Sequence, residues 1–145
     1  MVNRAIEYLQ SNGIYGWLIA DYNQCNPIFE KITGSETSNI TRPIWIWITL
    51  LSEPQLLVHE VDIVHFDSDF NVESYGSRTQ MIDKLNNYVK GNAGKVPVIA
   101  MEYSNEFQLT RVSKVSAGVI ELIASLGAKI TSSADLLQYL SLIHI

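Results

Sequence analysis

The sequence contains very little cysteine, and this limits how the fold can be stabilised. Cys25 is the single cysteine among 145 residues, so no internal disulfide can form. A chain without disulfides fits a reducing compartment, and we expect a cytoplasmic protein. We interpret Cys25 as a small buried residue, because free cysteines are most often buried and no histidine has a sequence context that places it nearby as a base.

Positive charge is also scarce, and it is not clustered. Ten Lys and Arg residues stand against fifteen Asp and Glu, which gives a net charge of -5, and the basic residues are scattered along the chain. Proteins that bind nucleic acids gather basic side chains to neutralise the phosphates. The sequence therefore predicts no nucleic-acid partner.

Long apolar runs are missing as well. The longest, residues 43–51, suits a buried strand and is far too short to cross a bilayer. The first residues predict an amphipathic helix that carries Arg4 and Glu7, unlike the apolar core of a signal peptide. We therefore expect no membrane-spanning segment and no membrane partner.

Several motifs of known active sites do not occur. The chain has neither G-x-G-x-x-G nor G-x-x-x-x-G-K-[ST], the glycine patterns that bring backbone N–H groups close to phosphates. It also lacks the G-x-S-x-G turn that presents the nucleophile of many serine hydrolases. No nucleotide site and no serine nucleophile is predicted.

One polar segment, "HEVDIVHFDSD", could in principle bind a metal ion. Zincin metallopeptidases place two histidines four residues apart on one helical face, whereas positions 59 and 65 are six apart. A calcium loop needs a glycine, and none lies between residues 59 and 75. A polar connection between two strands is the better interpretation of this cluster, which comprises His59, Glu60, Asp62, His65, Asp67 and Asp69.

Segments typical of helices and of strands alternate along the chain. Runs rich in β-branched and aromatic residues at 42–50 and 55–60 predict a hairpin, and neither shows polar alternation, so helices should cover both faces. We expect one α/β domain with a mixed sheet flanked by helices. Further strands are predicted at 16–21, 71–76, 96–103 and 129–135, and helices at 2–12, at 26–34, after Ser77, at 111–127 and after Ser132 or Ser133.

Four stretches, taken in order, resemble one known family. They are "GIYGWLIADYNQCNPIFEKITG" at 13–34, "PQLLVHEVD" at 54–62, "MEYSNEFQLTRVSKVSAGVIELIASLGAKI" at 101–130 and "SSADLLQ" at 132–138. Together they are similar to the amino-terminal domain of the creatinase and prolidase family, in the branch of Xaa-Pro aminopeptidases and Xaa-Pro dipeptidases. The order of an Asp-aromatic pair, an Asn-Pro pair, "MEYS" and "SSADL" carries this resemblance.

The resemblance implies that residues 1–138 are the first domain of a two-domain enzyme, with a ribonuclease-H-like fold. Residues 139–145 are then an apolar tail at the boundary where the catalytic domain would follow. In relatives, that second, pita-bread domain holds two divalent metal ions on two Asp, one His and two Glu ligands. None of these five ligands can be carried over to this sequence, so we expect no catalytic residue, metal ligand or cofactor in this chain.

The resemblance also implies a role. In relatives the amino-terminal domain supports dimer formation and restricts the metal site to short peptides. We therefore expect self-association, and short Xaa-Pro peptides as ligands of the full-length enzyme only. The alternatives are a free-standing module that binds a protein or a small ligand, and, less favoured, a hydrolase built on the His59–Asp69 segment.

Candidate residues of the substrate pocket are Asp21, Tyr22 and Asn26, which follow an interior strand. Related domains often carry Arg after the Asp-aromatic pair, whereas this chain has Asn23, which weakens a role in holding a substrate carboxylate. A structural interpretation is favoured for two of them. Asp21 caps the turn, and Asn26 with Pro27 starts a helix.

Overall fold

The core of the structure is a six-stranded mixed sheet. A computed structural model describes residues 1–66, 70–90 and 94–143, and its strands follow the order β4-β3-β2-β1-β5-β6. Strand β2 runs antiparallel to β1 and β3, whereas the pairs β1–β5, β3–β4 and β5–β6 are parallel. The strands are β1 (Gly16–Asp21), β2 (Ile44–Thr49), β3 (Gln55–His59), β4 (Asn71–Tyr75), β5 (Val98–Met101) and β6 (Lys129–Ser132).

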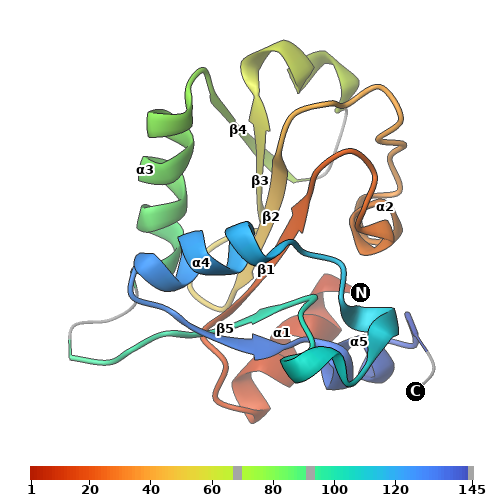
Figure 1. Cartoon of the computed structure of the whole chain (residues 1–145), viewed down its shortest axis with the longest axis vertical. Helices are drawn as coiled ribbons and strands as arrows, with labels where there is room; N and C mark the ends of the chain where they lie inside the picture. Colours follow the sequence, from red (N-terminus) through yellow and green to blue (C-terminus); the bar gives the residue numbers. More distant parts are fainter. Residues whose placement is uncertain (67–69, 91–93, 144–145) are drawn as a thin grey trace.

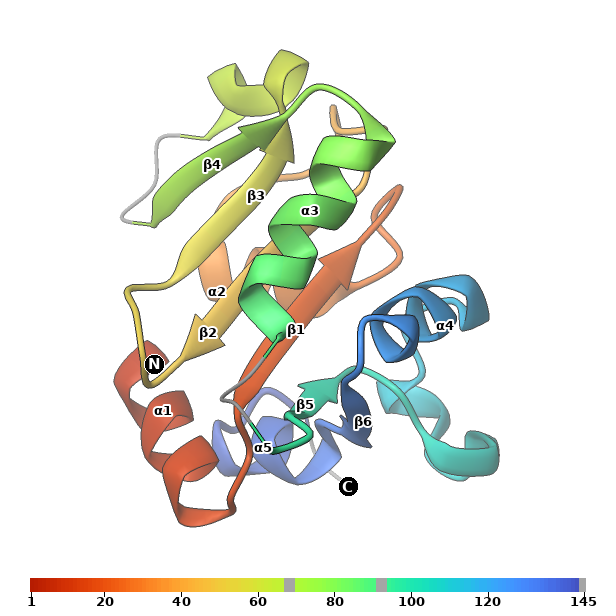
Figure 2. The ribbon, with the colours of Figure 1, turned by 90° about the vertical axis from the view of Figure 1, so that its left-hand side faces the viewer.

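Helices cover both faces of this sheet. Helices α1, α2 and α5 lie on one face, and α3 and α4 lie on the other (Figures 1 and 2). The expected α/β domain with a mixed, helix-flanked sheet is thus confirmed. Within the described ranges, no helix has the length and apolar character needed to cross a membrane. The helices are α1 (Val2–Ser11), α2 (Pro27–Thr33), α3 (Arg78–Val89), α4 (Ala117–Ser125) and α5 (Ala134–Tyr139), with the 3-10 helices η1 (Glu60–His65), η2 (Asn105–Phe107) and η3 (Thr110–Val112).

The central strands are buried on both sides, which explains their lack of polar alternation. In β1, Trp17 and Ile19 pack in the cluster that includes α1, α2 and α5, whereas Leu18 and Ala20 pack in the cluster that includes α3 and α4. Successive side chains of a strand point to opposite faces, so a strand between two helical layers must be apolar throughout. The predicted hairpin is confirmed by the antiparallel register of β2 and β3.

The helix expected over residues 111–127 begins later than the sequence suggested. The backbone N–H groups of Lys114 and Val115 donate to the carbonyl of Glu102 at 2.9 and 3.2 Å, which holds this segment against the end of β5. Helix α4 then starts after Ser116, whose hydroxyl oxygen accepts from the N–H of Val119. The prediction of a helix from residue 111 was wrong because a long-range backbone contact competes with the helical pattern.

The segment from residue 139 to residue 143 packs on the domain. Leu140 is buried in the core, and the Lys31 ammonium donates to the carbonyl of Leu142 at 3.1 Å. The Arg4 guanidinium donates to the carbonyl of Tyr139 at 2.8 Å and lies 5.0 Å from the centre of its ring. Helix α5 is thereby fastened to α1, on the face where Figure 1 shows the two lying together, and the last two residues of the sequence lie outside the described ranges.

A first prediction concerns the close approach at the start of β1. A Cβ atom at Gly16 would lie 2.1 Å from Cη2 of Trp47, so we expect Gly16→Ala to lower the free energy of unfolding by about 1–3 kcal/mol. Gly118→Ala is the matched control, because its Cβ would meet nothing within 4 Å and alanine favours the helix. Urea unfolding should show a gain of roughly 0.5 kcal/mol for the control. Equal stabilities for the two variants would contradict the packing described.

Candidate functional site

A cavity opens where β1 ends, between helices α3 and α4. Its volume is about 330 Å³, within the range of roughly 300–1,000 Å³ typical of small-molecule sites. Figure 2 shows the carboxyl end of β1 passing between these two helices. Strand β1 and the turn after it form one wall, the segment before α4 forms another, and side chains of β2 and α3 complete the lining.

The structure separates the three predicted site residues. Asp21 and Tyr22 line the cavity, and the Tyr22 side chain is 58% exposed. Asn26 is 1% exposed and does not line the cavity. Its side-chain oxygen accepts from the N–H of Ile28 as the N-cap of α2. The backbone N–H of Asn26 donates to Oδ1 of Asp21 at 2.9 Å. Asp21 therefore caps the turn and lines the cavity at once, whereas Asn26 has a structural place.

The turn between β1 and α2 has an unusual backbone. Asn23 and Gln24 adopt positive φ angles of 57° and 59°, and the N–H of Cys25 donates to the carbonyl of Tyr22 at 3.3 Å. Asparagine tolerates this left-handed conformation better than most side chains, so Asn23 suits this position of the turn. The turn also corrects one prediction, because Cys25 is exposed rather than buried.

Sequence reasoning missed a fully buried carboxylate at the end of β5. The Oε2 atom of Glu102 accepts from Nε1 of Trp17 at 2.8 Å and from the hydroxyl of Ser133 at 2.9 Å. Its Oε1 atom accepts from Nδ2 of Asn26 at 2.7 Å. Burial raises the pKa of Glu102 above its ordinary value, and the three donors act against that rise. The available signal was a charged residue directly after the apolar strand 98–101.

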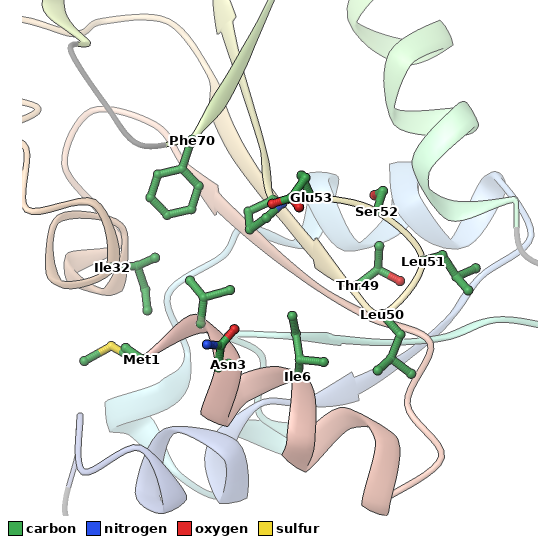
Figure 3. Close-up of a pocket in the computed structure, with 12 residues that line it drawn as sticks. Met1, Asn3, Ile6, Ile32, Thr49, Leu50, Leu51, Ser52, Glu53 and Phe70 are labelled. Carbon is green, nitrogen blue, oxygen red and sulfur yellow. The ribbon is translucent and has the colours of Figure 1, made fainter.

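A second hollow, larger and more open, lies between α1, α2 and the β2–β3 turn. Its volume is about 840 Å³. Figure 3 shows Ile6 and Ile32 facing the hollow from two helices, with Leu50 and Leu51 on the turn opposite. Leu50 and Leu51 are 45% and 64% exposed, so this hollow, which we call the α1–α2 groove, presents an apolar rim to solvent.

The described residues do not fit the two divalent metal ions that the resemblance implies for a catalytic domain. Across residues 1–66, 70–90 and 94–143, no three His, Cys, Asp or Glu side chains come together in a way that could hold a metal ion. Nδ1 of His59 instead accepts from the N–H of Val61 at 3.1 Å, and Asp62 pairs with Arg42 at 3.9 Å. Asp67 and Asp69 of the polar segment lie outside the described ranges.

Comparison with known proteins by sequence gives no match, either to models of protein families or to curated proteins. Comparison with solved structures gives many matches. These matches define the class of the chain: it is an α/β domain whose fold is found, over almost its whole length, in solved structures.

The particular fold is that of creatinase/prolidase amino-terminal domains. Similar structures include such a domain of an X-Pro dipeptidase from Streptococcus pyogenes (TM-score 0.68, 13% identity, 94% of this chain and 95% of that chain). They also include the prolidase of Pyrococcus horikoshii OT3 (TM-score 0.66, 20% identity, 99% of this chain and 35% of that chain). A third is the X-Pro aminopeptidase of Thermotoga maritima MSB8 (TM-score 0.71, 19% identity, 100% of this chain and 36% of that chain). The chain thus spans about a third of these two enzymes, and the fold implied by the resemblance is confirmed.

The Glu102 network gives a second prediction. Because the folded-state pKa of Glu102 is raised, the unfolded chain loses this proton first as the pH rises above 4.5, and the free energy of unfolding falls until the raised pKa is passed. Glu102→Gln removes this part of the pH dependence. It also costs about 1–3 kcal/mol at pH 7, because an amide has one acceptor oxygen for three donors.

Urea unfolding between pH 4 and pH 8 measures both effects. Glu121→Gln on the exposed face of α4 is the matched control and should leave the profile unchanged. The buried carboxyl of Asp21, whose pKa is also raised, mainly by burial, gives the same background slope in all three proteins. A Glu102→Gln profile parallel to that of the wild type would contradict the prediction.

Proposed function

We propose that this chain is the amino-terminal domain of an Xaa-Pro metallopeptidase of the creatinase and prolidase family. The observation that carries the proposal is the end-to-end match with an isolated amino-terminal domain of an X-Pro dipeptidase, which leaves 5% of that domain uncovered. The ordered motifs from Asp21-Tyr22 to "SSADL" support the same family independently of the fold. In this proposal the domain does not catalyse; it supports oligomerisation and restricts access to a metal site carried by another domain.

The proposed restriction of access rests on the turn after β1. Tyr22 is exposed at the rim of the cavity, on a turn that the Asn26–Glu102 hydrogen bond fixes at its far end. An exposed aromatic side chain on a fixed turn is suited to narrowing the entrance of a neighbouring active site. Asp21 holds that turn through the N–H of Asn26.

The peptidase proposal is tested with the reading frame beyond codon 145. We expect it to encode the five-ligand set, and the complete protein to cleave Leu-Pro in the presence of Mn²⁺ while residues 1–145 alone do not. In the complete protein, Tyr22→Ala should raise the kcat/KM for a longer Xaa-Pro peptide relative to Leu-Pro. Phe107→Ala is the control, because Phe107 is an aromatic residue of similar exposure that does not line the cavity.

Two results would contradict this proposal. One is turnover of Leu-Pro by residues 1–145 alone, and the other is a reading frame that ends without any metal ligands. The second result would favour the alternative, a free-standing module that binds a small ligand, for which the 330 Å³ cavity is the favouring observation.

Self-association is proposed to use the α1–α2 groove. Its exposed leucines form the kind of apolar rim that is buried when two copies meet. We expect Leu51→Lys to weaken self-association, measured by sedimentation velocity, by at least about tenfold in Kd. Val96→Lys is the matched control, since Val96 is 67% exposed and lies outside the groove. A monomeric wild type, or equal effects of both variants, would refute this interface.

A further inference from the structure

The cavity at the end of β1 has a buried, apolar floor. Its lining includes Ala20 of β1, Trp45 of β2 and Met81 of α3, which are 5%, 2% and 8% exposed. Ala20 and Trp45 are partners in the antiparallel register, so both side chains lie on the face that α3 and α4 cover. Because strand residues alternate between faces, the Asp21 side chain lies on the other face, with that of Ile19. Among the described residues, the floor therefore has no charged side chain.

The rest of the lining becomes more polar toward solvent. Val119 of α4 and Val115 before it are half-buried, as is Lys114, the basic residue of the described lining. Tyr22 and Cys25 are exposed and form part of the rim. The cavity thus passes from an apolar floor to a polar rim, and a ligand that fills it leaves water mainly through apolar contacts.

One polar atom of the floor has no partner. Nε1 of Trp45 is buried and forms no hydrogen bond with any residue that the structure describes. The indole of Trp17, in the neighbouring strand, instead donates from its Nε1 to Glu102 at 2.8 Å. Buried donors are nearly always paired, because an unpaired one has lost its water without replacement. An acceptor atom on a ligand in the cavity would supply the missing partner.

The size of the cavity also defines the ligand. Apolar cavities of roughly 150 Å³ hold a benzene ring. The volume of about 330 Å³ therefore leaves room for a ring with a substituent. Buried water makes about three hydrogen bonds, whereas the floor offers the single N–H of Trp45 among apolar side chains. A molecule with a large apolar surface and one acceptor matches this floor better than water does.

We propose that this cavity binds a small, uncharged, mainly apolar molecule that carries one hydrogen-bond acceptor, and that Nε1 of Trp45 donates to this acceptor. The apolar part of the ligand packs on Ala20, Met81 and Val119. The proposal goes beyond the proposed function, because the site is formed wholly by this chain and its occupation requires no catalytic domain.

The first test uses the unmodified 145-residue chain, labelled with ¹⁵N, and three one-ring probes. Toluene has no strong acceptor, acetophenone adds one carbonyl, and benzoate is charged. We expect toluene and acetophenone to cause saturable NMR shifts at the amides of Val115 and Val119, with Kd below about 5 mM. Benzoate should bind at least about tenfold more weakly than acetophenone, because the floor cannot replace the water of its carboxylate.

The indole signals test the proposed hydrogen bond. Acetophenone should move the Nε1–H signal of Trp45 downfield, as expected for a proton that becomes hydrogen-bonded, and toluene should not. The signal of Trp17 is the internal reference, because its Nε1 already donates to Glu102. The spectrum of Trp45→Phe assigns the Trp45 signal.

Trp45→Phe also measures the contribution of the donor. It should lower the affinity for acetophenone about fivefold relative to that for toluene. The ratio is the readout, because the two probes differ in how readily they leave water. Trp47→Phe is the matched control and should leave the ratio unchanged, since Trp47 lies on the same face of β2 and outside the lining.

A second pair of variants tests the location. Val119→Phe should fill the cavity and lower the affinity for both uncharged probes at least about tenfold. Ile120→Phe is the matched control, because Ile120 is the next half-buried residue of α4 and does not line the cavity. Thermal unfolding of each variant confirms that it is folded.

Four results would overturn the proposal. Two need no variant: absence of binding by toluene and acetophenone up to about 5 mM, and benzoate binding as tightly as acetophenone, which would indicate a charged ligand. The others are a Trp45 indole signal and affinity ratio that do not change, and equal effects of Val119→Phe and Ile120→Phe. None of these measurements depends on peptidase activity, so failure of this proposal is distinguishable from failure of the proposed function.

Discussion

The buried carboxylate of Glu102 is the interaction on which the rest of this structure depends. An ionised carboxylate inside a protein costs several kcal/mol unless hydrogen bonds replace its water. Here the replacement comes from Trp17 in β1, Asn26 at the start of α2 and Ser133 before α5. Because each donor belongs to a different segment, the carboxylate is satisfied only when β1, α2, β5 and α5 have taken their native places. Its solvation requirement therefore acts as a constraint on the whole arrangement.

Both walls of the cavity follow from that constraint. On one side, Nδ2 of Asn26 donates to Glu102 and to the carbonyl of Ala20, which fixes the far end of the turn that carries Tyr22. On the other side, the carbonyl of Glu102 accepts from Lys114 and Val115 and delays the start of α4. One residue thus positions the turn after β1 with its side chain and the segment before α4 with its backbone. The cavity lies between two segments that are distant in sequence and joined through Glu102.

The sequence predicted the layers of this fold well because local rules determine them. Strands β1 and β2 are apolar on both faces, which is visible within each strand. The cap of α3 at Ser77 likewise involves only residues of one helical turn. The site was harder to predict. Glu102 meets Trp17, Asn26 and Ser133 across separations of 85, 76 and 31 residues, and no periodic pattern reports such contacts. The same reason explains why α4 was predicted too long. Cys25 was expected to be buried because free cysteines usually are, whereas it lies exposed in the turn after β1.

The competition for Ser133 shows how far the influence of Glu102 extends. A serine that precedes a helix ordinarily accepts from a backbone N–H in the first turn, but the hydroxyl of Ser133 donates to Glu102, and α5 has no such bond from its N-cap. The hydroxyl oxygen of Ser132 accepts from the N–H of Ala134 instead, at 3.1 Å. Helix α5 therefore begins where the buried carboxylate requires, and its contacts with α1 through Arg4 and Tyr139 follow from that starting point. The turn beside the cavity and the helix that packs on α1 are consequently positioned by the hydrogen bonds of one buried carboxyl group.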